Sequence, residues 1–126
     1  MLRTRTVVRS VVALAVLAAV GVSLPPLSLA IDEAAMPPTS SLPALPDGAR
    51  VTAEGKGCGS GGCWRELTVE PPAGMPGEAL AAAVVPDDAA CAFQGVLDLR
   101  RVCTGVMSVD AGSVRFYVQY DRWVDP

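Results

Sequence analysis

The stretch GKGCGSGGCWRELTV, residues 55–69, contains two cysteines separated by four small residues. After the second cysteine, apolar Leu67 and Val69 alternate with polar residues, which is the period of a half-buried β-strand. The glycines between Cys58 and Cys63 tolerate the backbone angles of a tight turn. We therefore expect the end of a β-hairpin here, with the two cysteines facing each other across it.

Three chemistries compete for these cysteines: a redox centre, a metal site and a structural disulfide. Redox pairs usually have the Cys-x-x-Cys spacing at the start of a helix, whereas this spacing is longer and precedes a strand. A zinc site needs two short spacings, but eleven residues lie between Cys91 and Cys103. Proximity along the chain favours structural disulfides Cys58–Cys63 and Cys91–Cys103, worth about 2 and 3 kcal/mol by chain entropy.

The rest of the C-terminal part predicts a small α+β domain. Its hydrophobic patterns indicate strands at 49–54, 66–70, 99–109 and 114–123, and one short helix at 78–85. Residues 87–95 are expected to form a loop. The order β-β-α-β-β predicts an antiparallel sheet covered by one helix. In the last strand, one face is apolar and is assigned to the core: Val114, Phe116, Val118 and Tyr120.

The N-terminus has the charge pattern of an exported protein. Residues 1–9 form a basic tip, residues 10–31 carry no charge, and Asp32 and Glu33 follow. This asymmetry predicts a cytoplasmic N-terminus and a C-terminal domain outside the cytoplasmic membrane. Residues 10–31 are either a single-pass transmembrane anchor or a signal peptide.

Two observations bear on cleavage. An uninterrupted helix over 10–24 reaches only about 22 Å, short of a ~30 Å hydrocarbon core, and Pro25 and Pro26 are expected to end it. Small residues up to Ala30 then suit signal peptidase, which predicts secretion after cleavage following Ala30. A helix that starts at Val7 would reach about 27 Å and favours a retained anchor, which is our leading prediction.

Residues 32–47 are rich in proline and are predicted to form an extended stalk of about 50 Å. Residues 48–126 form the predicted disulfide-stabilised ectodomain. Beyond residue 31 the chain carries thirteen acids against seven bases, a net charge of −6. This balance argues against nucleic acid as a partner.

No histidine is present, which removes the commonest general base and the commonest metal ligand. We expect no cofactor, no metal site and no catalytic residue. Ser60 has no base candidate near it, the adjacent acids Asp87 and Asp88 are typical of a solvated turn, and the pair Arg100 and Arg101 suits an edge position.

Three residues form a candidate binding patch: Trp64, Arg115 and Tyr117. Trp, Tyr and Arg supply most binding hot spots. Because buried aromatic area stabilises a small domain, the leading interpretation places Trp64 in the core over the disulfide. Its alternation with Leu67 supports the alternative, an exposed position on the opposite face. Trp123 is expected to be a core or edge residue.

Several segments together resemble small uncharacterised envelope proteins of actinobacteria that have one N-terminal membrane helix. They are the basic tip with its apolar helix, the LPALPDGA motif at 42–49, CGSGGCWRELTV at 58–69 and RRVCTGV with VRFYVQYDRW at the C-terminal end. The resemblance covers most of the chain. It implies no activity and assigns no functional residue.

The leading functional prediction is a membrane-anchored, non-enzymatic binding or accessory module of the cell envelope, with another envelope protein or a wall component as its partner. The alternatives are a secreted enzyme, either a hydrolase or a thiol oxidoreductase, and a purely structural spacer. The oligomeric state is left open.

Overall fold

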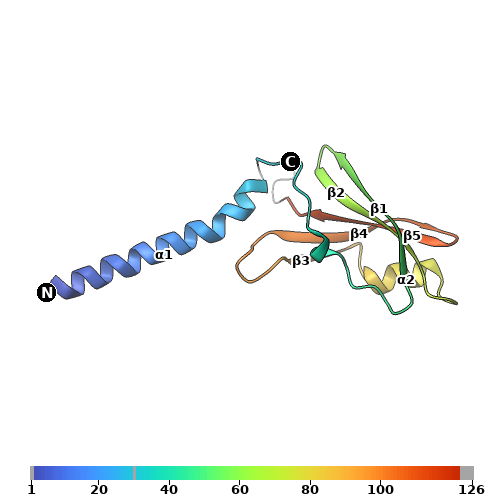
Figure 1. The fold of residues 1–126 in the computed structure, drawn as a ribbon, viewed down its shortest axis with the longest axis horizontal. Coiled ribbons are helices and arrows are strands. Elements are labelled where there is room, and N and C mark those ends of the chain that lie inside the picture. Colours follow the sequence, from blue (N-terminus) through green and yellow to red (C-terminus); the bar gives the residue numbers. More distant parts are fainter. Residues whose placement is uncertain (1, 30, 123–126) are drawn as a thin grey trace.

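The computed structural model of the chain describes residues 2–29 and 31–122. A long N-terminal helix, α1 (Leu2–Leu29), leads to a small domain made mainly of strands (Figure 1). The domain begins with a short 3-10 turn at Thr39–Ser41 and contains one further helix, α2 (Gly77–Val84). Its strands are β1 (Arg50–Gly59), β2 (Gly62–Glu70), β3 (Ala89–Phe93), β4 (Arg101–Asp110) and β5 (Ser113–Tyr120).

The five strands form one antiparallel sheet in the order β1-β2-β5-β4-β3. Three connections are hairpins, and α2 carries the chain from β2 to the opposite edge of the sheet. The predicted α+β class, antiparallel sheet and covering helix are confirmed.

One face of the sheet packs against α2 and forms the core. Val114, Phe116 and Val118 of β5 are fully buried, as the period of two in this strand predicted. They contact Leu67 and Val69 of β2, and Leu80 of α2 covers them. Burying such apolar side chains contributes about 1.5 to 3 kcal/mol each, so this layer is the main source of the domain's stability.

Strand β3 occupies a segment that the sequence predicted as a loop. Ala89–Phe93 pairs with β4, and Cys91 lies directly opposite Cys103. All five side chains of β3 are exposed. Because no side chain of this segment is buried, its sequence lacks the alternation of apolar and polar residues that predicts a strand. Its pairing depends on β4 and on the disulfide.

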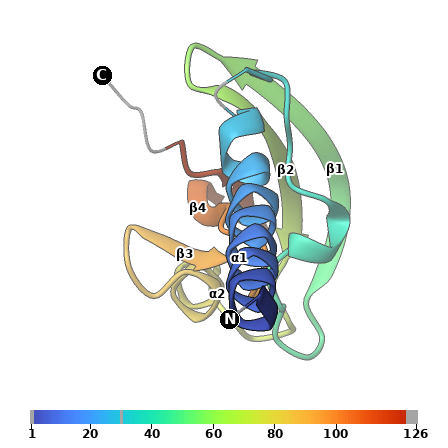
Figure 2. The same cartoon turned by 90° about the vertical axis from the view of Figure 1, so that its left-hand side faces the viewer.

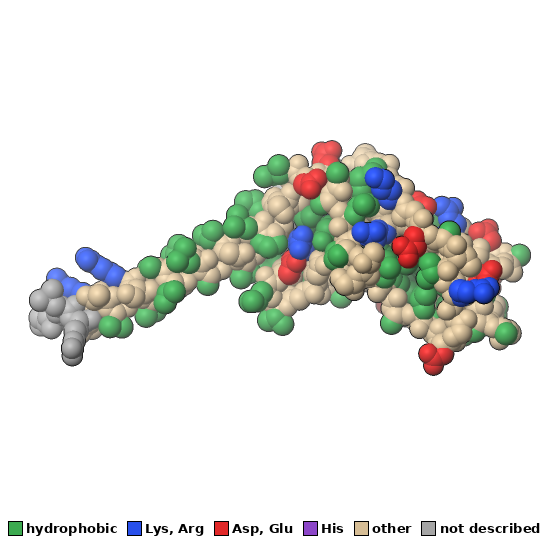
Figure 3. All heavy atoms as spheres, viewed as in Figure 1, with side chains coloured by type: hydrophobic (Ala, Val, Ile, Leu, Met, Phe, Trp, Pro, Cys, Tyr) green, Lys and Arg blue, Asp and Glu red, His purple; other side chains and the backbone are tan. Residues whose placement is uncertain are grey.

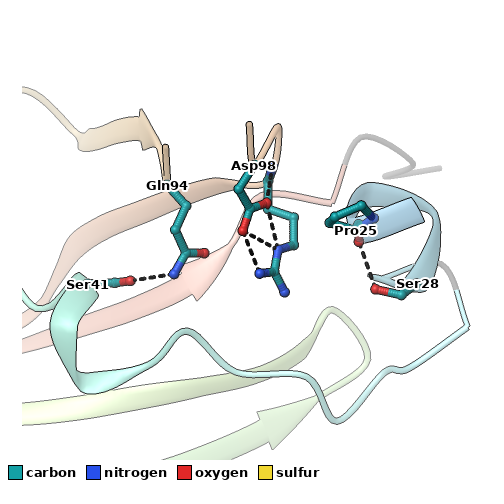
Figure 4. A network of polar contacts seen from close by, with 6 residues as sticks. Pro25, Ser28, Ser41, Gln94 and Asp98 are labelled. Carbon is teal, nitrogen blue, oxygen red and sulfur yellow. Dashed lines mark hydrogen bonds and ion pairs between the residues drawn. The ribbon is translucent and has the colours of Figure 1, made fainter. Parts of the chain in front are cut away.

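Helix α1 also differs from the prediction, because it continues through Pro25 and Pro26 to Leu29. Proline removes its own N–H bond, but its fixed φ angle is helical. Two serine hydroxyls also donate to helix carbonyls near the prolines. The Ser23 hydroxyl donates to Ala19 O at 2.7 Å. The Ser28 hydroxyl donates to Pro25 O at 2.7 Å (Figure 4).

The proline-rich segment does not project as a free stalk, which corrects the prediction for 32–47. Pro37 is fully buried, and its carbonyl accepts a hydrogen bond of 2.6 Å from Nε of Arg65. Leu42 and Leu45 pack against the core. An extended chain needs no internal hydrogen bonds, so its apolar residues are free to lie on the domain.

Both predicted disulfides, Cys58–Cys63 and Cys91–Cys103, are present, and the described residues contain no free cysteine. Each joins residues that face each other across neighbouring strands. The β1–β2 turn is tight, with Gly59 opposite Gly62. Gly62 has a φ of 107°, and a Cβ there would lie 2.7 Å from Nε of Arg122, so only glycine fits this position.

Candidate binding surface on the open face of the sheet

The sheet has a second face, opposite α2, which we call the open face. Successive residues of a strand point to opposite sides of the sheet. The open face therefore carries the side chains of β2 and β5 that alternate with the core residues. The register places Trp64 opposite Gln119, and Glu66 opposite Tyr117. Strand β4 continues both rows with Cys103 and Gly105.

Trp64 is half-buried and lies across the glycines of β1. A Cβ at Gly57 would come within 2.5 Å of indole Cε2, and one at Gly59 would lie 3.5 Å from Cζ3. The indole Nε1 donates a hydrogen bond of 2.9 Å to Glu66 Oε1. The ring is therefore supported from below by glycine backbone and held at its edge by a carboxylate. Trp64 lies on the face opposite Leu67, as its alternation indicated, so the interpretation of Trp64 as a core residue over the disulfide is wrong.

Tyr117 is supported in the same way on the neighbouring side. Its ring occupies the space above Gly105 of β4, where any Cβ would collide with the ring carbons and the hydroxyl. Bare glycine in a strand interior costs conformational entropy, and an aromatic ring from the next strand covers the exposed backbone. Both aromatic rings of the open face are thus positioned by glycines on adjacent strands.

Glu66 links the two halves of the open face. Its Oε2 accepts a hydrogen bond of 2.9 Å from Arg115 Nη2, while Oε1 accepts the bond from Trp64. The hydrogen bond from Trp64, followed by that from Arg115, holds the pKa of the Glu66 carboxyl below its ordinary value. The side chains of Arg115 and Glu66 are 43% and 25% exposed, so solvent screens this ion pair and it orients more than it stabilises.

A shallow hollow of about 310 Å³ opens on this face and is lined by Trp64, Met107, Tyr117 and Gln119. The structure thus brings together all three residues of the predicted patch, Trp64, Arg115 and Tyr117. Glu66, Gln119 and Met107 also belong to this surface and were not predicted from the sequence. Alternation with Leu67 and Val118 would have found the first two, whereas Met107 depends on the bulge between Val106 and Ser108.

A larger cavity of about 620 Å³ lies elsewhere, where α1 meets the domain. Pro26, Leu27 and Leu29 of α1 line one side, and the β1–β2 turn lines another. Arg122 crosses this junction: Nη1 donates to Leu29 O at 2.7 Å and Nη2 to Asp32 O at 2.9 Å. Figure 2, seen along α1, shows the helix at the end of the sheet, with β1 and β2 to one side and β3 and β4 to the other.

The remaining residues named from the sequence lie outside the open face. Ser60 is part of the β1–β2 turn, and Asp87 and Asp88 are exposed between α2 and β3. Arg100 pairs with Asp98, and its guanidinium lies 5.1 Å from the centre of the Tyr120 ring. Arg101 pairs with Asp121 at 2.9 Å. Strand β4, which begins at Arg101, lies between β5 and β3, so the edge position predicted for the two arginines is wrong. Trp123 falls outside the described residues.

Comparison with models of known protein families, with curated proteins and with solved structures finds no match.

Proposed function

We propose that the chain is a single-pass, membrane-anchored extracytoplasmic module that binds another envelope protein through the open face. The proposal includes a cytoplasmic N-terminus and an external domain. The charge asymmetry around α1 supports this orientation, and the two disulfides fit an oxidising compartment. It also agrees with the resemblance to small actinobacterial envelope proteins.

The length of α1 supports a retained anchor. Thr4–Leu29 has 26 residues with a mean hydropathy of 2.3, and none of its 18-residue apolar window is buried against the domain. At about 1.5 Å per residue this helix is about 39 Å long, more than a ~30 Å hydrocarbon core requires. The prediction of a cleaved signal peptide relied on a helix that ended before Pro25, and the observed helix is longer. Its composition alone fits both an anchor and a signal sequence.

The contact between the end of α1 and the domain also supports a retained anchor. Leu29 is buried, and Arg122 binds its carbonyl. Cleavage after Ala30 needs the preceding residues to extend into the active site of signal peptidase. Here Leu29, one residue before Ala30, is helical and its carbonyl is bound by Arg122, so an extended conformation at Leu29 would require the loss of both features.

The observation that carries the binding function is the composition of the open face. Protein interfaces are enriched in Trp, Tyr, Met and Arg at their centres, and Trp64, Tyr117, Met107 and Arg115 are the residues gathered here. The only acid among them, Glu66, is already paired with Arg115. The two rings are held by glycines, so little side-chain entropy is lost when a partner covers them.

In-cell photocrosslinking tests this proposal. A photoreactive amino acid replaces Gln119, which lies between the two rings and leaves both intact. The control carries the same probe at Ala111 in the β4–β5 turn, which does not line the hollow. We expect a product of discrete mass from residue 119 and none from residue 111, and Met107→Asp should abolish it while Ala111→Asp should not.

The product also separates the alternatives. A discrete protein adduct identified by mass spectrometry supports the proposal, whereas a heterogeneous glycan adduct assigns a wall component instead. Equal labelling at residues 119 and 111, with no discrete product, would favour a structural spacer. Disulfide reduction of insulin by the purified protein would favour a thiol oxidoreductase and overturn the non-enzymatic function.

Two measurements test the anchor. Alkaline phosphatase fused after the C-terminal residue should be active in cells, because that enzyme works only outside the cytoplasm. N-terminal sequencing of the membrane fraction should find the intact start, whereas a major species that begins at Ile31 would show cleavage.

A further inference from the structure

The loop between β3 and β4 exposes an unusual amount of apolar surface. Val96 is 96% exposed and Leu97 76% exposed at its tip, and Phe93 at the end of β3 is 56% exposed. Isolated exposed apolar residues are common, but three large ones in five consecutive positions form a patch. Such a patch marks a contact with another apolar surface.

The loop presents these residues in a fixed arrangement. The backbone N–H of Gln94 donates to Arg100 O at 3.0 Å, which closes the base of the loop. Inside it, Nε of Arg100 donates to both carboxylate oxygens of Asp98, at 2.9 and 3.0 Å (Figure 4). Gln94 Nε2 donates to the Ser41 hydroxyl at 3.0 Å, which ties the loop to the domain.

The same contacts remove charge from the tip. Asp98 and Arg100 are the only charged residues between β3 and β4, and they neutralise each other. The loop therefore has no net charge to attract anionic lipid and no unpaired charge to resist an apolar environment. Its chemistry suits the boundary between headgroups and acyl chains.

The loop lies beside the outer end of α1. Leu99 lines the same cavity as Pro26 and Leu27 of α1. Figure 1 shows the β3–β4 loop at the end of the domain that faces α1, and Figure 3 shows hydrophobic side chains projecting from that end. A ~30 Å span that begins at Val7 ends about twenty residues later, near Pro26, so the loop lies at the level of the outer membrane boundary.

We propose that the β3–β4 loop inserts Val96 and Leu97 into the outer leaflet of the membrane that α1 spans. The inference rests on the proposed membrane anchor. The inserted loop forms a second attachment point beside α1, so the domain lies against the bilayer in one orientation. The neutral, apolar tip and its continuity with α1 favour lipid over a protein partner.

The test uses the full chain in vesicles of phosphatidylcholine and phosphatidylglycerol. An environment-sensitive fluorescent amino acid replaces Val96, which avoids a new cysteine beside the disulfides. A second sample carries it at Ala111 in the β4–β5 turn, and a third at Leu17 in the middle of α1. Lipids with a spin label near the headgroup or deep in the acyl chain then quench the probes according to depth.

We expect several-fold stronger quenching at residue 96 than at residue 111, most of it from the shallow label, and quenching at residue 17 from the deep label. Leu97→Asp should reduce quenching at residue 96 and leave residue 17 unchanged, whereas Ala111→Asp should change neither. Quenching at residue 17 with residue 96 no more quenched than residue 111 would overturn the loop insertion and leave the anchor standing.

Three other outcomes have distinct meanings. Absence of quenching at residue 17 would refute the anchor itself, and the loop insertion with it. Quenching at residue 96 that survives Leu97→Asp would show that the probe, not the loop, enters the membrane, and would overturn the inference. Shielding of residue 96 by an envelope extract but not by lipid alone would assign the loop to a protein.

Discussion

The Cys91–Cys103 disulfide should hold β3 to the sheet, and its removal should release that strand locally. Strand β3 has five residues, lies at the edge of the sheet and buries none of its side chains. Apart from backbone hydrogen bonds to β4, the disulfide is its main attachment. The change is the double substitution Cys91→Ala and Cys103→Ala.

The expected loss follows from the length of the closed ring. A sequence separation of 12 gives about 3 kcal/mol of chain entropy, against about 2 kcal/mol for the separation of 5 at Cys58–Cys63. For a domain of this size, 3 kcal/mol lowers Tm by about 12 to 24 °C. The matched control, Cys58→Ala with Cys63→Ala, should lower Tm less, because nine register pairs still hold β1 to β2.

The decisive assay is hydrogen exchange followed by mass spectrometry, carried out on the full chain in detergent micelles. Peptides over 89–93 should exchange faster in the first variant while β5 stays protected. In the control variant, β1 should keep its protection outside the turn. Unchanged exchange in β3, or a larger Tm loss in the control, would refute the view that the disulfide is the principal attachment of β3.

Three further predictions concern the open face and the helix junction. Gly105→Ala should displace the Tyr117 ring and lower the free energy of unfolding by about 1 to 3 kcal/mol in thermal unfolding. Gly112→Ala, where a Cβ would meet open space, should be neutral. Equal effects of the two substitutions would contradict the packing of Tyr117 on Gly105. The hydrogen bonds from Trp64 and Arg115 lower the pKa of Glu66, so their stabilisation is complete above the ordinary pKa of a glutamate. It is lost as the pH falls through the lower pKa of the folded state. Glu66→Gln should therefore flatten the acid side of a Tm–pH profile, and an unchanged slope would refute this. Arg122→Ala should broaden spin-label distances between α1 and the β1–β2 turn, and unaltered distances would show that its two carbonyl contacts do not hold the junction.

The parts of the fold that the sequence predicted are those where side chains alternate between core and solvent. Residues 114–120 form the clearest case, because every second side chain is fully or nearly fully buried. The same parity placed Trp64 on the face opposite Leu67 and made Arg115 and Tyr117 its neighbours. When one face of a sheet is buried, every second residue of a strand is apolar. The strand and the face of each residue can therefore be predicted from a short stretch of sequence.

The parts that could not be predicted depend on contacts distant in sequence. β3 has no buried side chain, and its partner β4 begins only after a loop. Proline counts alone predicted a free segment, but Leu42 and Leu45 reach a core built from β2, α2 and β5. The support of Trp64 by Gly57 requires the register of β1 on β2, which no local pattern specifies.

The positions of the two disulfides have a common consequence. Each pins an edge strand to its inner neighbour, β1 to β2 and β3 to β4, and both lie in adjacent rows at the same end of the sheet. That end carries the β1–β2 turn, the β3–β4 loop and the contact of Arg122 with α1. Edge strands are the least restrained parts of a sheet, because only one side is paired. Covalent links at the end next to α1 therefore fix the elements through which the domain would meet the bilayer if α1 is the proposed anchor, and the hydrophobic layer beneath α2 holds the opposite end.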